Sequence, residues 1–341
     1  MNCNDCKKNK MIHLSGKDSF VIYQDTISKK NKIAVGQWHL FDFKKQISKP
    51  SFVCNVFNKE TYFIDGEISN LEKKVKIEKP ELFDEKDVSK EDYKKSVKKI
   101  INYCNEDIIE KCILSRVVKS DFEISNYFEI FEKLSQTYSK GFKYILNHPK
   151  HGMWIGVSPE TLIKGNFENG FFTHALAGSK SKNENLKWTE KDYQEHKYVV
   201  DFIEGKIKEN GYITKESKIE EEIAGEIIHL NKDFNFNLDI DFLSFVKTLH
   251  PTPAIAGIPL DKSLEIIHDL EVHNRSLYCG FLGTIDNKNC DLKVNLRCAR
   301  FSAKEVQIFV GGGITSQSNP NDEFKETEIK SQTLLSVIKK K

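Results

Sequence analysis

Two acidic segments with the same spacing hold the residues of this chain that are best suited to chemistry. Near the C-terminus, Glu323 and Glu326 stand one helical turn apart, and Lys330 continues the same face of the expected helix. Asp192 and Glu195 repeat this spacing at the start of a second amphipathic segment. Like charges one turn apart repel each other, so a cation between them is expected.

These two acidic pairs have two interpretations. If they meet in space, their oxygens suit Mg²⁺, which takes one or two carboxylates and keeps its other positions for water and an anionic substrate. A glycine run at Gly311–Gly313 precedes the C-terminal pair and lets a backbone approach a ligand closely. If the pairs do not meet, they are solvated acidic helix faces, and spacing alone does not decide between the two.

Two further ionisable residues stand at the ends of apolar, strand-like segments. Lys111 begins the run from 112 to 118, and a lysine that loses its proton on burial can act as a general base. Glu160 follows the apolar run at 154–157, where burial would keep a carboxyl protonated and able to act as a general acid. The alternatives are a lysine whose stem packs on the sheet while its head reaches water, and a glutamate in an exposed turn.

Arginine is rare in this chain and is therefore expected where its planar fork is needed. Only four of the 52 basic residues are arginine, a side chain that grips a carboxylate with two parallel hydrogen bonds. Arg297 and Arg300 alternate with apolar residues, so one of them is expected to point inward and to need an anionic partner. Arg275 follows Glu271 by four residues, which indicates a structural ion pair. His250, just before a proline, could donate a hydrogen bond to a ligand or cap a helix C-terminus.

The elements that would position these residues are a mixture of strands and helices. Strands are expected at 19–23, 33–40, 52–57, 61–64, 112–118, 144–147, 154–157, 162–165, 277–285, 292–301 and 306–310. Helices are expected after Ser89, at 127–138, 192–210, 243–249 and 264–272, and from 321 to near the end. Residues 71–92 look like a surface connection.

The order of these elements predicts the fold class. Strands come in consecutive groups rather than in strict alternation with helices, which favours an α+β fold over a doubly wound parallel sheet. We expect a single large α+β domain over residues 1–341, with a strand-rich N-terminal part at 1–88 and the candidate residues in the part at 89–341.

Composition limits the classes of protein to which the chain can belong. With 39% hydrophobic and 30% charged residues, it has the composition of a soluble globular protein. No apolar run approaches the ~20 residues of a transmembrane helix, and the N-terminus lacks the apolar core of a signal peptide, so we expect a cytoplasmic protein. A net charge of +2 gives no reason to expect nucleic-acid binding. Cys3 and Cys6 have zinc-like spacing, but no second pair follows them.

Taken in order, these segments resemble the chorismate-utilising enzymes: isochorismate synthase, salicylate synthase, anthranilate synthase component I and aminodeoxychorismate synthase component I. The resemblance runs from about Glu91 to Lys330 and rests on nine blocks in the family's order: Lys111–Arg116, Ser158–Glu160, Ala175–Ser179, Glu195–His196, Leu249–Ala254, Tyr278–Gly280, Leu296–Ala299, Gly311–Ile314 and Glu323–Lys330. It implies that family's fold, with two large, mostly antiparallel sheets packed as a sandwich core and helices outside. It also implies that residues 89–341 form the chorismate-binding catalytic part.

Within the family, three positions favour isochorismate synthase, an isomerase. Lys111 matches the lysine that activates water in the isochorismate and salicylate synthases, whereas enzymes that use ammonia typically have glutamine there. Ala177 stands where aminodeoxychorismate synthases commonly carry a nucleophilic lysine. The segment Leu249–Ala254 reads Leu-His-Pro-Thr-Pro-Ala, a form typical of isochorismate synthases, whereas the salicylate and anthranilate enzymes usually have a phenylalanine-proline version.

The resemblance implies an Mg²⁺-dependent interconversion of chorismate and isochorismate. Lys111 would deprotonate a water that adds at C2 of the ring, and Glu160 would protonate the departing C4 hydroxyl. No glutaminase subunit is needed if water is the nucleophile, and we expect a monomer that acts on chorismate without a nucleic-acid or membrane partner. The isochorismate would feed menaquinone, a siderophore or another product.

The same resemblance implies which residues hold the metal and the substrate. Mg²⁺ would bind the ring carboxylate and orient the substrate. Glu195 and Glu326 would ligate the metal directly, while Asp192 and Glu323 would hold its waters. The residues that would contact the rest of the substrate are Gly178, Ser179, His250, Tyr278, Arg297, Gly311 and Lys330.

Departures from the family pattern are mild, and other functions stay open. Gly312 replaces a usual alanine, Ser179 a usual threonine and Phe324 a common tryptophan. Salicylate synthase would add a pyruvate-eliminating step at the same site, and only the Leu249–Ala254 segment speaks against it. An inactive homologue would have lost a catalytic residue or a metal ligand, and none is lost. A lysine-rich nucleic-acid binder would cluster its lysines without the 50 interspersed acidic residues found here.

Overall fold

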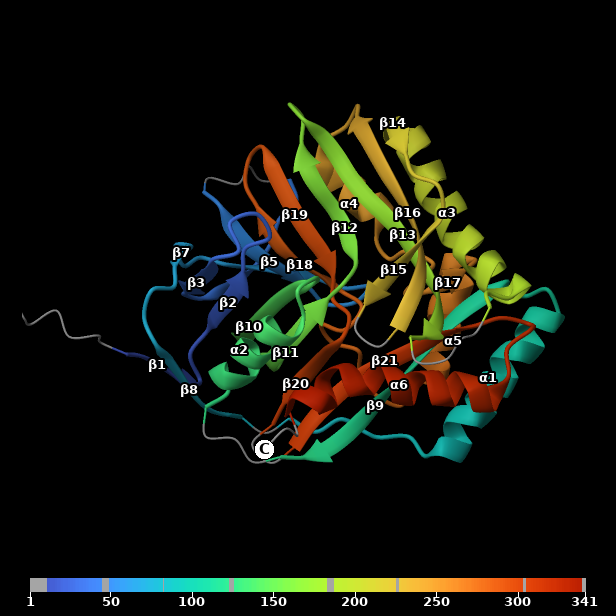
Figure 1. Cartoon of the computed structure of the whole chain (residues 1–341), viewed down its shortest axis with the longest axis horizontal. Helices are drawn as coiled ribbons and strands as arrows, with labels where there is room; N and C mark the ends of the chain where they lie inside the picture. The colour runs from blue at the N-terminus through green and yellow to red at the C-terminus, as the bar shows by residue number, and fades with distance from the viewer. Residues whose placement is uncertain are drawn as a thin grey trace, which may run out of the picture.

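Two large β-sheets face each other, and helices pack outside them (Figure 1). The computed structural model describes residues 11–44, 49–81, 83–122, 126–182, 187–224, 227–302 and 305–338. Neighbouring strands within both large sheets run antiparallel. This holds for the short pair at Gly257 and for the ten-residue pairing of Glu305–Ile314 with the strand that Lys111 opens. The expected α+β class, with two mostly antiparallel sheets as a sandwich core, is confirmed. The zinc-like pair Cys3 and Cys6 lies outside the described residues.

The first sheet has nine strands and carries the lysine and the glycine run that the sequence singled out. Its strands in spatial order are β17 (Gly257–Ile258), β9 (Lys111–Asp121), β21 (Glu305–Ile314), β20 (Cys298–Phe301), β11 (Gly152–Ser158), β10 (Phe142–His148), β2 (Phe20–Gln24), β3 (Asn31–Val35) and β7 (Ser69–Asn70). β9 pairs with β21 so that Gly313 lies opposite Ile113 and Gly311 opposite Ser115. The register therefore places the glycine run beside the start of the strand that Lys111 opens.

The second sheet has ten strands and supplies the opposite layer of the sandwich. Nine follow one another in space: β14 (Gly211–Glu216), β16 (Ile227–Leu238), β13 (Gly170–Ser181), β12 (Thr161–Asn166), β19 (Asn289–Val294), β18 (Phe281–Ile285), β5 (Ser51–Asn55), β6 (Thr61–Ile64) and β4 (Trp38–Leu40). The tenth, β15 (Glu220–Ala224), pairs with β16. A separate parallel pair joins β1 (Ile12–Gly16) to β8 (Val75–Pro80).

A hydrophobic core fills the space between the two sheets. Tyr23, Trp154 and Phe309 project into it from the nine-stranded sheet, and Phe52 and Phe234 from the ten-stranded sheet. All are almost fully buried. Side chains of this size each remove about 150–250 Å² from water, so the interface between the sheets is the main source of hydrophobic stabilisation.

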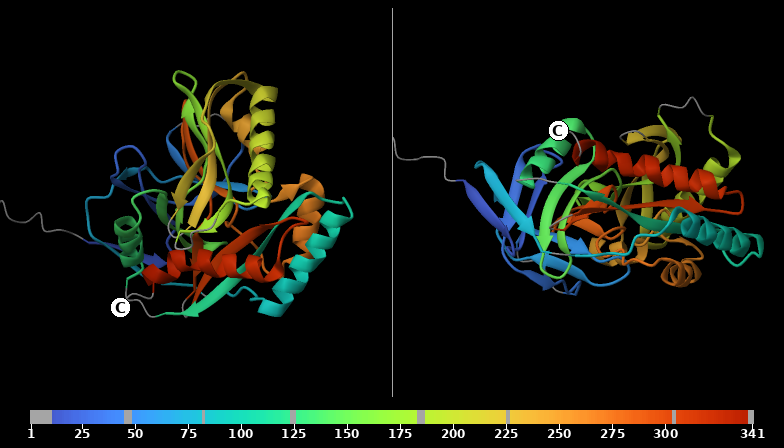
Figure 2. Two further views of the ribbon diagram at one scale, coloured as in Figure 1. Left: turned by 45° about the vertical axis from the view of Figure 1, so that its right-hand side comes forward. Right: turned by 90° about the horizontal axis from the view of Figure 1, so that it is seen from below.

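Six helices cover the sandwich over the described ranges: α1 (Lys90–Asn105), α2 (Phe128–Thr137), α3 (Glu190–Asn210), α4 (Phe242–Leu249), α5 (Leu260–Leu270) and α6 (Pro320–Ile338). α2 and α6 pack on the outer face of the nine-stranded sheet, and α1 and α5 pack beside β9. α3 lies along β13 and β16 (Figure 2). Ser89 caps α1 as predicted, since it accepts a hydrogen bond from Asp92 N, and Asp241 caps α4 by accepting one from Ser244 N.

Two residues connect the sheets next to the candidate general acid. β11 ends at Ser158 in the nine-stranded sheet, and β12 begins at Thr161 in the ten-stranded sheet. Pro159 and Glu160 therefore span the passage from one layer to the other. The backbone is fixed there by Val294 N, which donates to Glu160 O at 3.0 Å.

The structure corrects several of the expected elements. Strands β13, β14, β15 and β16 were not predicted, and residues 71–92 are not merely a surface connection because they contain β8. The strand expected at 277–285 begins only at 281, and the one expected at 292–301 is broken between Val294 and Cys298. Left-handed backbone explains both breaks, since Ser276, Cys279 and Arg297 have φ values of 49°, 62° and 47°.

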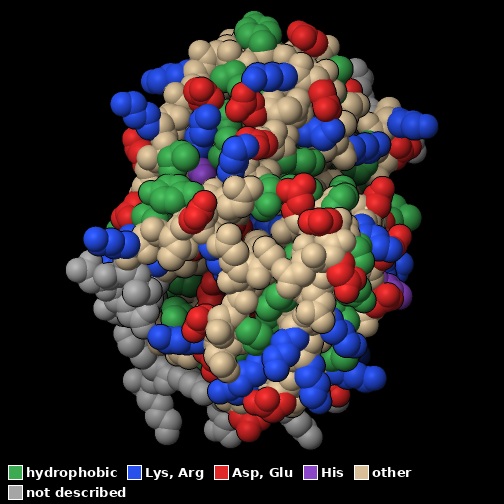
Figure 3. Space-filling view, turned by 90° about the vertical axis from the view of Figure 1, so that its right-hand side faces the viewer, with side chains coloured by type: hydrophobic (Ala, Val, Ile, Leu, Met, Phe, Trp, Pro, Cys, Tyr) green, Lys and Arg blue, Asp and Glu red, His purple; other side chains and the backbone are tan. Residues whose placement is uncertain are grey.

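The helices and the surface charge relate to two kinds of partner that were not expected, a membrane and a nucleic acid. None of the described helices combines the length and the hydropathy that crossing a bilayer requires. On the face that Figure 3 presents, acidic and basic side chains are interspersed.

The N-terminal part contributes β2, β3 and β7 to one large sheet and β4, β5 and β6 to the other.

Candidate functional site

A pocket between the two sheets brings most of the predicted residues together. Its walls include Ile113 and the glycine run from the nine-stranded sheet, and Leu176–Ser179 from β13. The predicted residues that line it are Glu160, Gly178, Ser179, Glu195, Tyr278, Arg297, Gly311 and Lys330. Lys111, Glu323 and Glu326 stand directly behind this lining and contact it through the side chains described below.

Three carboxylates at the pocket each face a lysine. The pairs are Lys111 Nζ–Glu195 Oε1 at 3.1 Å, Lys191 Nζ–Glu323 Oε1 at 2.6 Å and Lys330 Nζ–Glu326 Oε1 at 2.5 Å. Glu195 and Lys191 come from α3, while the other two acids come from α6. The two acidic segments therefore meet, as the sequence suggested, and the alternative of two separate solvated helix faces is wrong. Lys191 was not predicted, although it stands one residue before Asp192.

The glycine run makes room for these side chains. A Cβ at Gly313 would collide with Glu195 Oε1 and would lie 2.9 Å from Lys111 Cε. A Cβ at Gly312 would lie 3.2 Å from Glu323 Oε2 and 3.7 Å from Glu326 Oε1. Three carboxylates from two helices thus converge on two adjacent glycines, a closeness that any larger residue would prevent.

This convergence fits a hard divalent cation, although the lysines occupy the acids in this structure. Oε2 of Glu323 is buried without a hydrogen-bond partner in the described part of the chain and points toward Gly312, as Glu326 does. Carboxylate oxygens are the ligands that Mg²⁺ prefers. Among the described residues, no three His, Cys, Asp or Glu side chains are yet arranged as a ligand set. Glu195, Glu323 and Glu326 could hold the ion once lysine contacts are exchanged for it.

The two glutamates of α6 have different protonation preferences. Burial raises the pKa of Glu323 to about 7, despite the neighbouring Lys191 ammonium. Burial also disfavours the charged form of Glu326, but the ammonium groups of Lys330 and Lys191 outweigh it and hold the pKa of Glu326 below its usual value. Glu326 is therefore the more strongly anionic of the two.

Asp192 has a structural role at the start of α3. Its Oδ2 accepts a hydrogen bond from Thr189 N at 2.8 Å, and Thr189 Oγ1 accepts one from Asp192 N at 3.3 Å, so that the two bonds form a capping box. Asp192 is not among the residues that line the pocket. That it also holds a metal-bound water stays a prediction.

Lys111 and Glu160 are both buried at the pocket. Lys111 is 0% exposed, so its head does not reach water, and Lys111 Nζ forms no hydrogen bond with a described residue beside its ion pair with Glu195. Glu160 is 3% exposed, which excludes an exposed turn residue. Burial raises the pKa of Glu160 to about 8, although the charge of Lys111 opposes the shift. Glu160 is therefore protonated at neutral pH and can donate a proton.

Arg297 is aimed into the pocket by a histidine that the sequence analysis missed. Arg297 Nη2 donates to His229 Nε2 at 3.1 Å, so the proton of the neutral imidazole lies on Nδ1, which donates to Gly178 O at 2.8 Å. Burial, together with the positive charges of Arg297 and Lys330, lowers the pKa of His229 to about 3. Arg297 Nη1 is buried and has no hydrogen-bond partner among the described residues, so it is free for an anion. Ser179 Oγ lies 3.2 Å from His229 Nδ1.

Tyr278, Gly311 and Lys330 form the opposite side of the pocket. Lys330 Nζ donates to Gly311 O at 2.9 Å. The Tyr278 hydroxyl stands 3.1 Å from the place where a Cβ at Gly311 would lie, so only glycine leaves this space open. His250 lies behind Tyr278, and its Nε2 donates to Cys279 O at 2.9 Å. His250 is the C-cap residue of α4, with its backbone N donating to Val246 O, as one alternative had it. Burial lowers the pKa of His250 to about 4, so its side chain is a neutral donor and not a cation at the helix end.

Comparison with known proteins identifies the family of this chain. A family model described as "Chorismate binding enzyme" matches residues 7–339, and the chain therefore belongs to that family. It is 29% identical over 269 residues to the vibriobactin-specific isochorismate synthase of Vibrio cholerae, covering 72% of this chain and 66% of that protein. It is 26% identical over 267 residues to anthranilate synthase component 1 of Aquifex aeolicus, covering 73% and 53%.

Solved structures share the fold. MenF, the menaquinone-specific isochorismate synthase of Escherichia coli, superposes with a TM-score of 0.77 at 17% identity, covering 94% of this chain and 89% of MenF. The chain thus spans between about half and two thirds of the length of the two curated relatives that it matches. The expected fold of the chorismate-utilising enzymes is confirmed.

Proposed function

We propose that this chain is an isochorismate synthase, an Mg²⁺-dependent isomerase that interconverts chorismate and isochorismate. The observation that supports this most strongly is that a fully buried lysine and a buried carboxyl whose pKa is raised both lie at one pocket. Lys111 would act as the general base and Glu160 as the general acid. The name of the V. cholerae relative supports the same reaction.

The reaction needs one proton removed and one supplied. Lys111, uncharged, would take a proton from a water whose oxygen forms a bond to C2 of the ring. Glu160 would give its proton to the C4 hydroxyl, which leaves as water while the double bond shifts. Each proton transfer contributes about 10²–10⁴-fold to the rate. Because Glu195 faces Lys111 Nζ, the base role requires that Lys111 give up its proton together with this ion pair.

The substrate carries two carboxylates, and the pocket offers positive groups for both. Arg297 Nη1 and Lys330 Nζ would bind one carboxylate. A bound Mg²⁺ would neutralise the ring carboxylate and orient the substrate. Glu195 and Glu326 would hold the ion, with Glu323 and Asp192 beside its waters. Ser179, Gly178 and Tyr278 would contact the remaining polar groups, and His250 would support Tyr278 through the Cys279 carbonyl.

Water as the nucleophile fits the residues at positions 177 and 111. Ala177 lines the pocket where a nucleophilic lysine would have to stand. Lys111 would activate water as the nucleophile in place of ammonia, so we infer that no glutaminase subunit is needed to supply ammonia. We further infer a monomeric, cytoplasmic enzyme that acts on chorismate alone.

Incubation of the purified protein with chorismate and Mg²⁺, with and without EDTA, tests this proposal. Products would be separated by chromatography. Isochorismate that forms only when Mg²⁺ is free is the expected result. Salicylate together with pyruvate would instead identify a salicylate synthase, and chorismate that binds without turnover would indicate an inactive homologue.

A further inference from the structure

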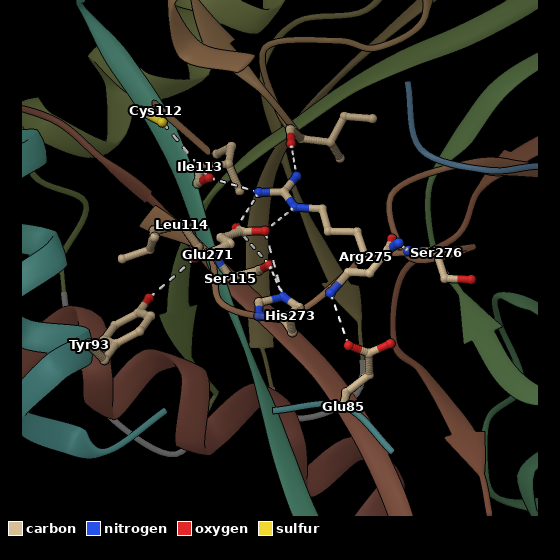
Figure 4. Close-up of polar contacts among 12 residues, drawn as sticks. Glu85, Tyr93, Cys112, Ile113, Leu114, Ser115, Glu271, His273, Arg275 and Ser276 are labelled. Atoms are coloured by element: carbon tan, nitrogen blue, oxygen red, sulfur yellow. Dashed lines mark hydrogen bonds and ion pairs between the residues drawn. The ribbon is translucent and has the colours of Figure 1, made fainter. Parts of the chain in front are cut away.

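A buried ion pair, Glu271–Arg275, lies directly behind the wall of the pocket (Figure 4). The sequence predicted a structural pair here, and the structure confirms the pair. We propose that Arg275 is also a positioning residue for the reaction, because it fixes Ile113, Ile255 and Tyr278 and thereby aims the strand that Lys111 opens. This inference rests on the proposed function for its kinetic test, and it has an independent binding test.

Arg275 uses its guanidinium to join two separate segments of the pocket wall. Its Nη2 donates to Ile113 O on β9 at 2.9 Å, and its Nη1 donates to Ile255 O at 2.7 Å. Ile113 and Ile255 both line the pocket. Arg275 itself is 4% exposed and does not line the pocket, so it acts through these carbonyls.

Glu271 holds the guanidinium in place and reaches the same strand. Its Oε2 accepts a hydrogen bond from Arg275 Nε at 2.8 Å, and its Oε1 accepts one from Arg275 Nη2 at 2.6 Å. This bidentate contact fixes the plane of the guanidinium. It also accepts hydrogen bonds from Ser115 N at 2.7 Å and from Ser115 Oγ at 2.8 Å. Ser115 Oγ in turn lies 2.9 Å from His273 Nε2. The pair therefore grips β9 at two residues, 113 and 115, near Lys111.

The backbone of Arg275 supports a third pocket residue. Its carbonyl accepts a hydrogen bond from Tyr278 N at 2.8 Å. The turn around Tyr278 contains two non-glycine residues with left-handed backbone, Ser276 and Cys279, with φ values of 49° and 62°. Such residues persist where the surroundings over-determine them, and they cluster at functional sites. Figure 4 shows Arg275 between Glu271 on one side and Ser276, where the turn begins, on the other.

A lysine could not replace this arginine. Only a planar fork can meet a carboxylate in two places while also donating to two carbonyls. The cost of misplacement is large, because a displacement of about 1 Å at reacting groups can reduce a rate by about 10²-fold. The buried Glu271–Arg275 pair would thus set the positions of Lys111 and of the Tyr278 hydroxyl.

The test uses a neutral replacement of the whole pair. Removing one partner leaves an unpaired buried charge, whereas exchanging both for neutral groups of similar size often leaves stability unchanged. We would compare Glu271→Gln/Arg275→Met with a matched control, Glu85→Gln/Arg300→Met. Arg300 is also buried and lies 2.9 Å from Glu85, and neither of these two residues lines the pocket. Glu85 Oε2 accepts a hydrogen bond from Asn274 N at 3.0 Å, and the amide oxygen of glutamine at position 85 can still accept it.

Both double variants should melt within a few degrees of each other. The Glu271→Gln/Arg275→Met variant should lose about 10²-fold in kcat, with a smaller rise in KM, while its Mg²⁺ affinity stays within twofold. The control should keep kcat and KM within twofold of the wild type. Values of kcat and KM for the Arg275 variant that match those of the control would overturn the proposal.

Two further measurements keep the test decisive. If the double variant does not fold, Arg275→Lys keeps the charge but loses the fork, and an unchanged kcat in that variant would overturn the proposal. If the wild type does not convert chorismate, the proposed function fails separately. The Arg275 role is then read from the chorismate dissociation constant by calorimetry, which should rise at least tenfold in the Arg275 variant and not in the control.

Discussion

Lys111 Nζ and Glu195 Oε1 lie 3.1 Å apart, and the two side chains meet against the backbone of Gly313. The expected base and one expected metal ligand are therefore partners of each other. A change at Glu195 should disturb both metal binding and proton transfer, whereas a change at Glu326, which pairs with Lys330, should act on the metal without touching Lys111.

Replacing Lys111 with alanine should remove water addition. The expected loss in kcat is about 10²–10⁴-fold, because one general base is lost. Chorismate should still bind in the presence of Mg²⁺, since Arg297 and Lys330 are untouched, and calorimetry would measure this. Lys143→Ala is the matched control, because Lys143 is also buried but does not line the pocket. Near-normal turnover in Lys111→Ala would show that the base is another group.

Glu160 should make the activity fall in alkaline solution. With a pKa of about 8, its carboxyl is protonated below that pH and loses the proton above it. The kcat should therefore decrease as the pH rises through about 8. Glu160→Gln keeps the shape of the side chain but cannot supply a proton, so kcat should drop about 10²–10⁴-fold. A pH–rate profile measured on both proteins checks this, and an unaltered alkaline limb in the variant would contradict it.

The same carboxyl should also make stability depend on pH. Its folded pKa of about 8 lies above the ordinary value of 4.5. Between these two values the folded chain holds a proton that the unfolded chain has released, so the free energy of unfolding should decrease as the pH rises. Urea unfolding of the wild type and of Glu160→Gln at pH 5, 6.5 and 8 would measure it. The decline should be shallower in the variant.

Glu326→Gln should weaken metal binding. Glu326 is held anionic by Lys330 and Lys191, and the amide removes that charge. We expect the Mg²⁺ dissociation constant to rise at least tenfold, a loss comparable to that seen when groups around a metal are changed. Titration calorimetry measures it. Glu328→Gln on the same helix is the control, because Glu328 is half exposed and pairs with Arg116 instead. Equal affinities in the two variants would exclude Glu326 as a ligand.

Gly313→Ala should inactivate the protein while leaving it folded. The new Cβ would collide with Glu195 Oε1 and approach Lys111 Cε to 2.9 Å, so the two side chains must separate. Turnover should fall at least tenfold. Gly205→Ala is the control, because a Cβ at that position in α3 would meet no atom within 4 Å. That control should instead gain about 0.5–1 kcal/mol of stability from helix propensity, seen as a higher melting temperature.

The sequence predicted the ionisable residues of the site better than their surroundings. The spacing of Glu323 and Glu326, repeated by Asp192 and Glu195, raised the possibility that the two segments meet, but spacing alone did not decide it. The structure brings Glu195 to the two acids of α6. Burial of Lys111 could not be decided from its strand, because a lysine stem can pack inside while its head reaches water. Ile258 of β17 pairs with Lys111, and Gly313 of β21 and Glu195 of α3 lie against its side chain, so elements distant in sequence enclose it.

The missed residues were missed for a physical reason. His229 lies on β16, a strand whose polar residues such as Lys232 and Asp233 obscure the apolar alternation that indicates a strand. Without β16, nothing indicated that an imidazole would reach Arg297. Lys191 lies on the polar face of α3, where a lysine usually reaches solvent, and only the approach of α6 gives it a buried partner. The break at Arg297 depends on a left-handed φ that local propensity does not predict for arginine.

The two-residue passage at Pro159 and Glu160 makes the position of the proposed proton donor depend on how the two sheets are aligned. The backbone of Glu160 is held by the ten-stranded sheet, where Val294 N of β19 donates to Glu160 O at 3.0 Å, whereas Lys111 belongs to β9 of the nine-stranded sheet. A core substitution that shifts one sheet against the other by a fraction of an ångström would move this carboxyl relative to Lys111. Mutations far from the pocket should then reduce turnover well before they lower the melting temperature, so catalytic rate is the more sensitive report on the packing of this sandwich.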